Sequence, residues 1–127
     1  MKVGCEAASK SPLIGVGMGD VEKETAKIYI KEYPALLQQD RLPPHNQFVY
    51  VYTGAGILGL VWFLTALFFP FFHHRHYKDK LFTFFFIISI ASFMVEATIE
   101  AQIGTAFYIF FLLLILNYLQ SKLNPHV

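Results

Sequence analysis

Hydrophobic and polar positions divide the chain into a charged first third and an apolar remainder. No Asp, Glu, Lys or Arg occurs between Arg41 and Arg75, and the stretch from Phe48 to Phe72 contains 25 residues without a charged side chain. At about 1.5 Å of rise per residue, such a helix can cross a bilayer core of roughly 30 Å. The pattern therefore predicts a membrane helix over residues 48–72.

Two further apolar segments complete the predicted architecture. In chain order, we expect an outer helical region at 1–47, membrane helices at 48–72, 81–99 and 101–121, a basic loop at 73–80 between the first two helices, and a tail at 122–127. Glu96 and Glu100 mark the boundary between the second and third membrane helices. The predicted fold class is an all-α membrane protein with an outer-face helical loop followed by three transmembrane helices.

The distribution of basic residues predicts the orientation. The loop at 73–80 and the tail contain Lys and Arg, whereas the turn at 96–102 contains neither. Because cytoplasmic loops are enriched in basic residues, the loop at 73–80 and the C-terminus are expected in the cytoplasm. The turn at 96–102 and the whole region 1–47 are then expected on the outer face.

Composition agrees with a membrane protein, since 55% of the residues are hydrophobic, 17% are aromatic and only 15% are charged. The formal net charge of +1 gives no reason to expect a nucleic-acid partner. The single Cys5 excludes an internal disulfide and a cysteine-rich metal site. Lys10 interrupts any apolar core of a signal peptide, so we expect preceding helices, not a leader, to place region 1–47 outside.

Candidate chemistry lies where the polar region meets the first membrane helix. His45 and Asn46 follow two prolines there, and Asn46 suits the N-cap of the helix. The partial positive charge of a helix N-terminus favours phosphate oxygens and disfavours an imidazolium, so a neutral His45 could accept a proton. The residues alone favour the other interpretation, a histidine that only caps the helix at the membrane interface. An alternating glycine turn, IGVGMGD, also has two interpretations, a ligand loop or a flexible turn before a helix.

The order of these motifs resembles a known family. GVGMGD, a polar helical stretch, PHNQF and GAGILGLVWFL, followed by EATIEAQIGTAFYIFF, together resemble the bacterial O-antigen ligase and polymerase family, from residue 15 to about residue 115. Members are polytopic inner-membrane proteins that act on polyprenyl-diphosphate-linked glycans. They have many more membrane helices than the three predicted here, so the chain resembles the C-terminal fragment of such an enzyme.

The resemblance implies a function and a set of site residues. A glycan would move from its polyprenyl-diphosphate carrier to an acceptor hydroxyl, in surface polysaccharide or lipopolysaccharide biosynthesis in the bacterial inner membrane, with residues 1–47 periplasmic. His45 is the implied catalytic residue, as a base or a diphosphate contact. The implied substrate-binding residues are Gly15, Gly17, Gly19, Arg41, Asn46 and Glu100. No cofactor or metal is implied, and the partners are the lipid-linked glycan, an acceptor glycolipid or glycan, membrane lipid and the missing N-terminal helices as a separate chain.

Other interpretations stay open. The chain could be a non-catalytic small membrane protein or an inactive remnant of such an enzyme. A transporter fragment is less favoured, because no charged residue falls in the middle of a predicted span. The cluster of His73, His74 and His76 suggests a metal site, but these residues are nearly adjacent and no cysteine accompanies them. Contact with anionic lipid headgroups explains this basic loop more simply.

Overall fold

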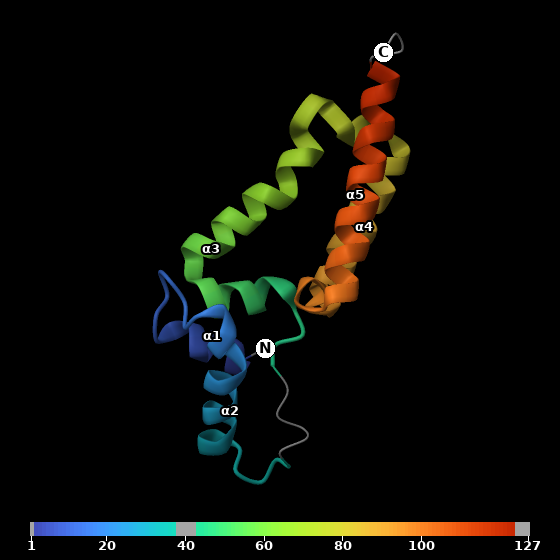
Figure 1. Ribbon diagram of the computed structural model, residues 1–127. Helices are drawn as coiled ribbons and strands as arrows, with labels where there is room; N and C mark the ends of the chain where they lie inside the picture. Colours follow the sequence, from blue (N-terminus) through green and yellow to red (C-terminus); the bar gives the residue numbers. More distant parts are fainter. Residues whose placement is uncertain (1, 38–42, 124–127) are drawn as a thin grey trace.

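The computed structural model describes residues 2–37 and 43–123, and every regular element in them is helical. Figure 1 shows their arrangement. The elements are α1 (Lys2–Ser9), η1 (Met18–Asp20), α2 (Val21–Glu32), α3 (Gln47–Phe72), η3 (His73–Lys78), α4 (Lys80–Val95), η4 (Thr98–Glu100) and α5 (Gln102–Leu123). The predicted all-helical class is therefore confirmed for the described residues.

The N-terminal helices form a small unit against the start of α3. Val3 and Ala7 of α1 pack against Ile28 of α2, and all three side chains are buried. The Thr53 hydroxyl of α3 donates a hydrogen bond to the Gly4 carbonyl of α1 at 3.0 Å. The described helices of region 1–47 thus pack against the first turns of α3, through α1 and the α2 that it holds.

The helix α3 bends sharply at Gly56, where φ is 65° and ψ is −167°. Residues 47–55 lie beside α1, whereas residues 57–72 run toward η3, and Figure 1 shows the change of direction. The sequence predicted one uninterrupted helix over 48–72, and that continuity is wrong. The 16 residues after the bend span about 24 Å, less than a bilayer core of about 30 Å.

The segment at residues 12–17 stabilises this bend, because its backbone replaces the hydrogen bonds that the interrupted helix loses. Four backbone hydrogen bonds join the two segments. Val16 N–H donates to the Thr53 carbonyl at 2.9 Å and Gly17 N–H to the Gly54 carbonyl at 2.8 Å, while Ile57 N–H donates to the Pro12 carbonyl at 2.9 Å and Leu58 N–H to the Leu13 carbonyl at 3.3 Å. Buried backbone groups need such partners. The glycine turn and the helix break therefore form one structural unit.

The second half of α3 meets a helical hairpin formed by α4 and α5. The buried side chains of this core are Leu67, Phe82, Phe86, Phe93, Ile115 and Leu119. The helix α4 ends at Val95, short of the predicted bound at residue 99, because Glu96 takes an extended conformation with φ −135° and ψ 148°. At 16 residues, α4 spans only about 24 Å.

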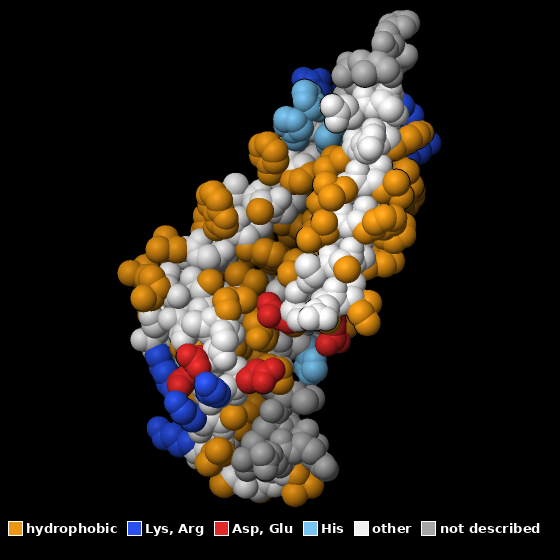
Figure 2. All heavy atoms as spheres, viewed as in Figure 1, with side chains coloured by type: hydrophobic (Ala, Val, Ile, Leu, Met, Phe, Trp, Pro, Cys, Tyr) orange, Lys and Arg blue, Asp and Glu red, His pale blue; other side chains and the backbone are white. Residues whose placement is uncertain are grey.

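Two stretches are long and apolar enough to cross a membrane, Gln47–Lys78 and Gln102–Lys122. In each stretch only 11% of the most apolar 18 residues are buried within the protein, so the others are at least partly exposed. Figure 2 shows hydrophobic side chains spread over α3 and α5, and charged side chains mainly toward the two ends of the molecule, one of them at α1 and α2. By length and composition, two of the three predicted spans could therefore cross a membrane, and the first of them includes the bend at Gly56. The 16 residues of α4 span only about 24 Å, less than a bilayer core of about 30 Å.

Candidate functional site

Polar side chains at the N-terminus of α3 contact the end of α4 and the turn between α4 and α5. Three consecutive residues of the PHNQF motif make one contact each: His45 Nδ1 with Glu96 Oε1 at 3.3 Å, Asn46 Nδ2 with the Met94 carbonyl at 2.9 Å, and Gln47 Oε1 with the Ile99 N–H at 2.8 Å. Each contact joins positions about 50 residues apart in sequence. We call His45, Asn46, Gln47 and Glu96 the HNQ site.

Asn46 fixes the first turn of α3. Its side-chain oxygen accepts hydrogen bonds from the Phe48 N–H at 3.0 Å and the Val49 N–H at 3.1 Å, which confirms the predicted N-cap. Both polar atoms of the amide are then engaged, because its nitrogen donates to Met94. The two capped N–H groups are not available to phosphate oxygens, contrary to the expectation that this helix end would favour a diphosphate.

The contact between His45 and Glu96 determines which ring nitrogen of the histidine is protonated. An ionised carboxylate only accepts hydrogen bonds, so a neutral imidazole must donate through Nδ1. The other nitrogen, Nε2, then carries a lone pair that can accept a proton. The two side chains are 53% and 65% exposed, so a substrate hydroxyl can approach them. This arrangement is suited to general base catalysis.

Gln47 is the buried member of the HNQ site. Its side chain is fully buried, its oxygen accepts from the Ile99 backbone, and its Nε2 has no hydrogen-bond partner among the described residues. By satisfying a backbone N–H of the turn, Gln47 holds Glu96 near His45. From the sequence alone, Gln47 has no predicted role, and Glu96 is not among the predicted site residues. Their positions next to His45 and at a helix boundary were the only indications in the sequence.

The remaining predicted substrate-binding residues lie apart from one another. Gly15 and Gly17 contact the backbone of α3 at its bend, whereas a side-chain carbon added at Gly19 would meet nothing within 4 Å. Glu100 is exposed on η4, and among the described residues its carboxylate has no hydrogen bond or ion pair. Arg41 lies outside the described residues. Among the described members of this predicted set, only Asn46 lies next to His45.

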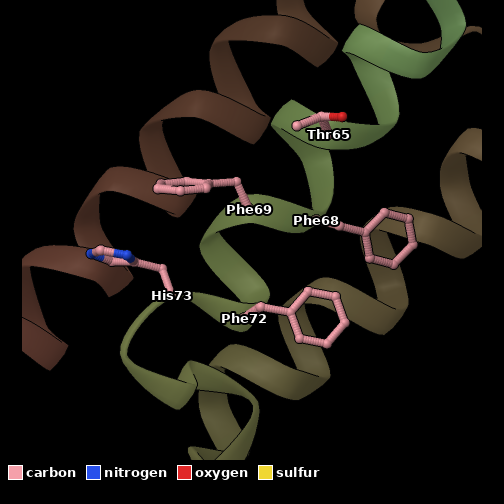
Figure 3. A pocket seen from close by; sticks show the side chains of 5 residues that line it. All are labelled: Thr65, Phe68, Phe69, Phe72 and His73. Carbon is pink, nitrogen blue, oxygen red and sulfur yellow. The ribbon is translucent and has the colours of Figure 1, made fainter.

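An apolar cavity of about 430 Å³ lies at the other end of α3 and contains none of the predicted site residues. Its lining residues, shown in Figure 3, are Thr65, Phe68, Phe69, Phe72 and His73. The rings of Phe69 and His73 stack with their centroids 5.1 Å apart and point to one side of the helix, while Phe68 and Phe72 point to the other. Apart from the His73 ring, the cavity offers little polar chemistry.

Comparison with known proteins adds no relative from which a role could be transferred. No family model, no curated protein and no solved structure matches this chain. The resemblance to the O-antigen ligase family therefore rests on the order of the motifs alone, and it stays a hypothesis.

Proposed function

We propose that the chain contributes to a membrane glycosyltransferase of the O-antigen ligase type. Such an enzyme moves a glycan from a polyprenyl-diphosphate carrier to an acceptor hydroxyl. The observation that carries the proposal is the pairing of His45 Nδ1 with Glu96 at 3.3 Å, because it leaves Nε2 of an exposed imidazole able to take a proton. The motif order of the sequence supplies the substrate class.

In the proposed step, His45 Nε2 removes the proton from the acceptor hydroxyl. The oxygen then attacks the anomeric carbon of the donor sugar, and a new glycosidic C–O bond forms. The bond between that carbon and the diphosphate breaks, and the leaving polyprenyl diphosphate keeps the electron pair. Glu96 stays ionised throughout and stabilises the imidazolium that forms.

The leaving diphosphate needs positive charge that the HNQ site does not provide. Glu96 and Glu100 make this end of the hairpin acidic, and Asn46 caps the first amides of α3. We therefore assign stabilisation of the diphosphate to Arg41 and to arginines of the accompanying helices, since the family resemblance implies that such arginines lie upstream of this region. This division of roles means that the chain needs a partner for full activity.

The proposed topology has three spans, with region 1–47 periplasmic and the C-terminus cytoplasmic in a bacterial inner membrane. Charge at the two ends of the hairpin supports this orientation. Lys122 lies 3.4 Å from Asp79, so the tail of α5 is beside the basic residues of η3. The opposite end contains Glu96 and Glu100 but no Lys or Arg between 96 and 102. Basic ends of membrane helices face the cytoplasm.

The test is glycan transfer in membranes from cells that make the chain, with labelled polyprenyl-diphosphate glycan and acceptor added. We expect His45→Ala to lower turnover by about 10²–10⁴-fold, the range for loss of a general base. Glu96→Gln should lower turnover by less, because Glu96 orients the ring without taking the substrate proton. The matched controls are His73→Ala at the other end of α3 and Glu22→Gln on α2, and both should retain turnover. Unchanged transfer with His45→Ala at equal membrane abundance would reject the proposal.

A non-catalytic role in helix packing is the second candidate, and one observation favours it. Large apolar side chains on α3 and α5 face away from the protein, including Trp62 at 77% and Ile103 at 85% exposure. Such faces suit contact with further membrane helices as well as with lipid. The same assay separates the two functions. If the chain is a packing subunit, transfer is lost when the whole chain is absent but is unchanged with His45→Ala.

A further inference from the structure

The end of the protein opposite the HNQ site contains a basic cavity of about 360 Å³ between η3 and the C-terminal turns of α5. Its polar lining residues are His74, Arg75, His76, Lys78, Asp79 and Lys122. Leu119 of α5 completes the lining, and its side chain is buried, as is that of His76. Figure 2 shows the histidine and basic side chains gathered at this end of the molecule.

We propose that this cavity binds the phosphate group of an anionic membrane lipid. Arg75, Lys78 and Lys122 provide three positive charges, against one carboxylate in the lining, that of Asp79. The Asp79 carboxylate already has two partners within the protein. Its Oδ1 accepts from the Phe82 N–H at 3.2 Å, and its Oδ2 lies 3.4 Å from Lys122 Nζ. The cavity therefore keeps a net positive charge for a phosphate.

The backbone of η3 is held in an unfavourable conformation at this cavity. His74 and Arg75 have φ values of 47° and 58°, in the left-handed region that residues with a side chain rarely adopt. Such strain persists where surrounding contacts hold it, and it gathers at binding sites. The holding contact here is His76 Nδ1, which donates to the Pro70 carbonyl at 2.9 Å. His76 also packs against the Phe82 ring, with centroids 5.4 Å apart.

The location of the cavity favours a lipid phosphate over a free one. It lies at the end of both stretches that are apolar enough to cross a membrane, since Lys78 and Lys122 are their last residues. Phe72 and Tyr77 at this end are exposed, which suits aromatic side chains at a membrane interface. A lipid whose chains lie along α3 or α5 would bring its headgroup phosphate to the level of Arg75.

The experiment uses the full chain in maltoside micelles, titrated by calorimetry with short-chain phosphatidylglycerol, short-chain phosphatidylcholine and inorganic phosphate. We expect phosphatidylglycerol to bind more tightly than phosphatidylcholine. Each basic residue near an anionic headgroup contributes about fivefold in affinity, so Arg75→Gln with Lys122→Gln should weaken binding about thirtyfold. Lys80→Gln is the control for a single charge, because it removes one positive charge at the same end from an exposed side chain outside the cavity lining, whereas the double variant removes two.

The remaining arms separate the possible outcomes. If inorganic phosphate competes with the lipid, the phosphate group alone is recognised. If inorganic phosphate does not compete, the lipid is required. Either result supports the site. A charge-preserving pair, Arg75→Lys with Lys122→Arg, should bind within about fivefold of the parent and excludes loss of folding as the cause. Equal affinity for phosphatidylcholine, or an equal loss with Lys80→Gln, would overturn the proposal. None of these outcomes depends on glycan transfer.

Discussion

Replacing Gly15 by alanine tests whether the glycine turn is structural. A side-chain carbon at this position would lie 2.3 Å from the Gly54 carbonyl oxygen and 2.5 Å from the Ala55 nitrogen, both of them backbone atoms of α3. Gly15 also has a φ of 74°, which an alanine adopts only with strain. Since neither neighbour is a flexible side chain, the segment at 12–17 must move away from α3.

The expected cost follows from three contributions. A left-handed alanine costs about 1–2 kcal/mol, and overpacking against a rigid neighbour costs about 1–3 kcal/mol. Separation of the segment weakens the hydrogen bonds of Val16 and Gly17 to α3, each worth about 1 kcal/mol. Because separation relieves the overpacking, these contributions partly replace one another, and we expect a total of about 3–5 kcal/mol.

The assay is thermal unfolding of the full chain in micelles, where this loss lowers the midpoint by about 10–20 °C. Hydrogen exchange at the Val16 and Ile57 amides should accelerate in the same variant, because both donate across the contact. The control is Gly19→Ala, where the added carbon meets nothing within 4 Å and which should change stability by no more than about 0.5 kcal/mol. Equal losses for the two variants, or no loss at Gly15, would refute the structural explanation.

Two further predictions concern a helix cap and an ion pair. Asn46→Ala removes the cap of α3 and the hydrogen bond to Met94, and it should lower the free energy of unfolding by about 1–2 kcal/mol in a thermal unfolding experiment. Asn46→Asp keeps the cap acceptor and should lower it by less. An equal loss for the two variants would contradict this explanation. Hydrogen bonds from Lys10 and Lys27 lower the pKa of Glu24 from 4.5 to about 2, so the stability that this carboxylate provides is complete above pH 4.5 and is lost as the pH falls toward 2. Glu24→Gln should remove this part of the loss of stability in acid. If the variant and the parent lose stability over the same pH range and by the same amount, this role of Glu24 is excluded.

Helix positions followed well from the sequence, because apolar runs and prolines are local signals. The 22-residue α5 begins one residue after its predicted start at 101 and ends two residues after its predicted end at 121. The bend of α3 could not be predicted in this way. Gly56 stands in an apolar run beside Gly54 and Gly59, and only the backbone of residues 12–17, some 40 positions earlier, makes it the point of interruption.

The site was predictable in part for the same reason. His45 and Asn46 could be located at a helix start from local pattern alone, and the cap of Asn46 followed. The partner of His45 could not be predicted, because two carboxylates, Glu96 and Glu100, lie in the turn between α4 and α5. The family resemblance implied Glu100 as a substrate-binding residue and named no partner for His45, whereas in the structure the extended backbone at Glu96 brings the Glu96 carboxylate to the imidazole. The sequence likewise predicted the same role for all three glycines of the turn. In the structure, Gly15 lies against the backbone of α3, whereas Gly19 does not.

The bend at Gly56 and the HNQ site are mechanically connected. Residues 47–55 form a rigid lever of nine residues, about 14 Å long, with the bend at one end and His45 just beyond the other. A rotation of about 30° at the bend would therefore move His45 by about 7 Å, more than twice the 3.3 Å that separates it from Glu96. Docking of the glycine turn on α3 fixes that angle through backbone hydrogen bonds, which tolerate little displacement. The glycines at 15 and 17 can thus be essential for a histidine that they never touch, by keeping its imidazole within reach of the carboxylate that orients it.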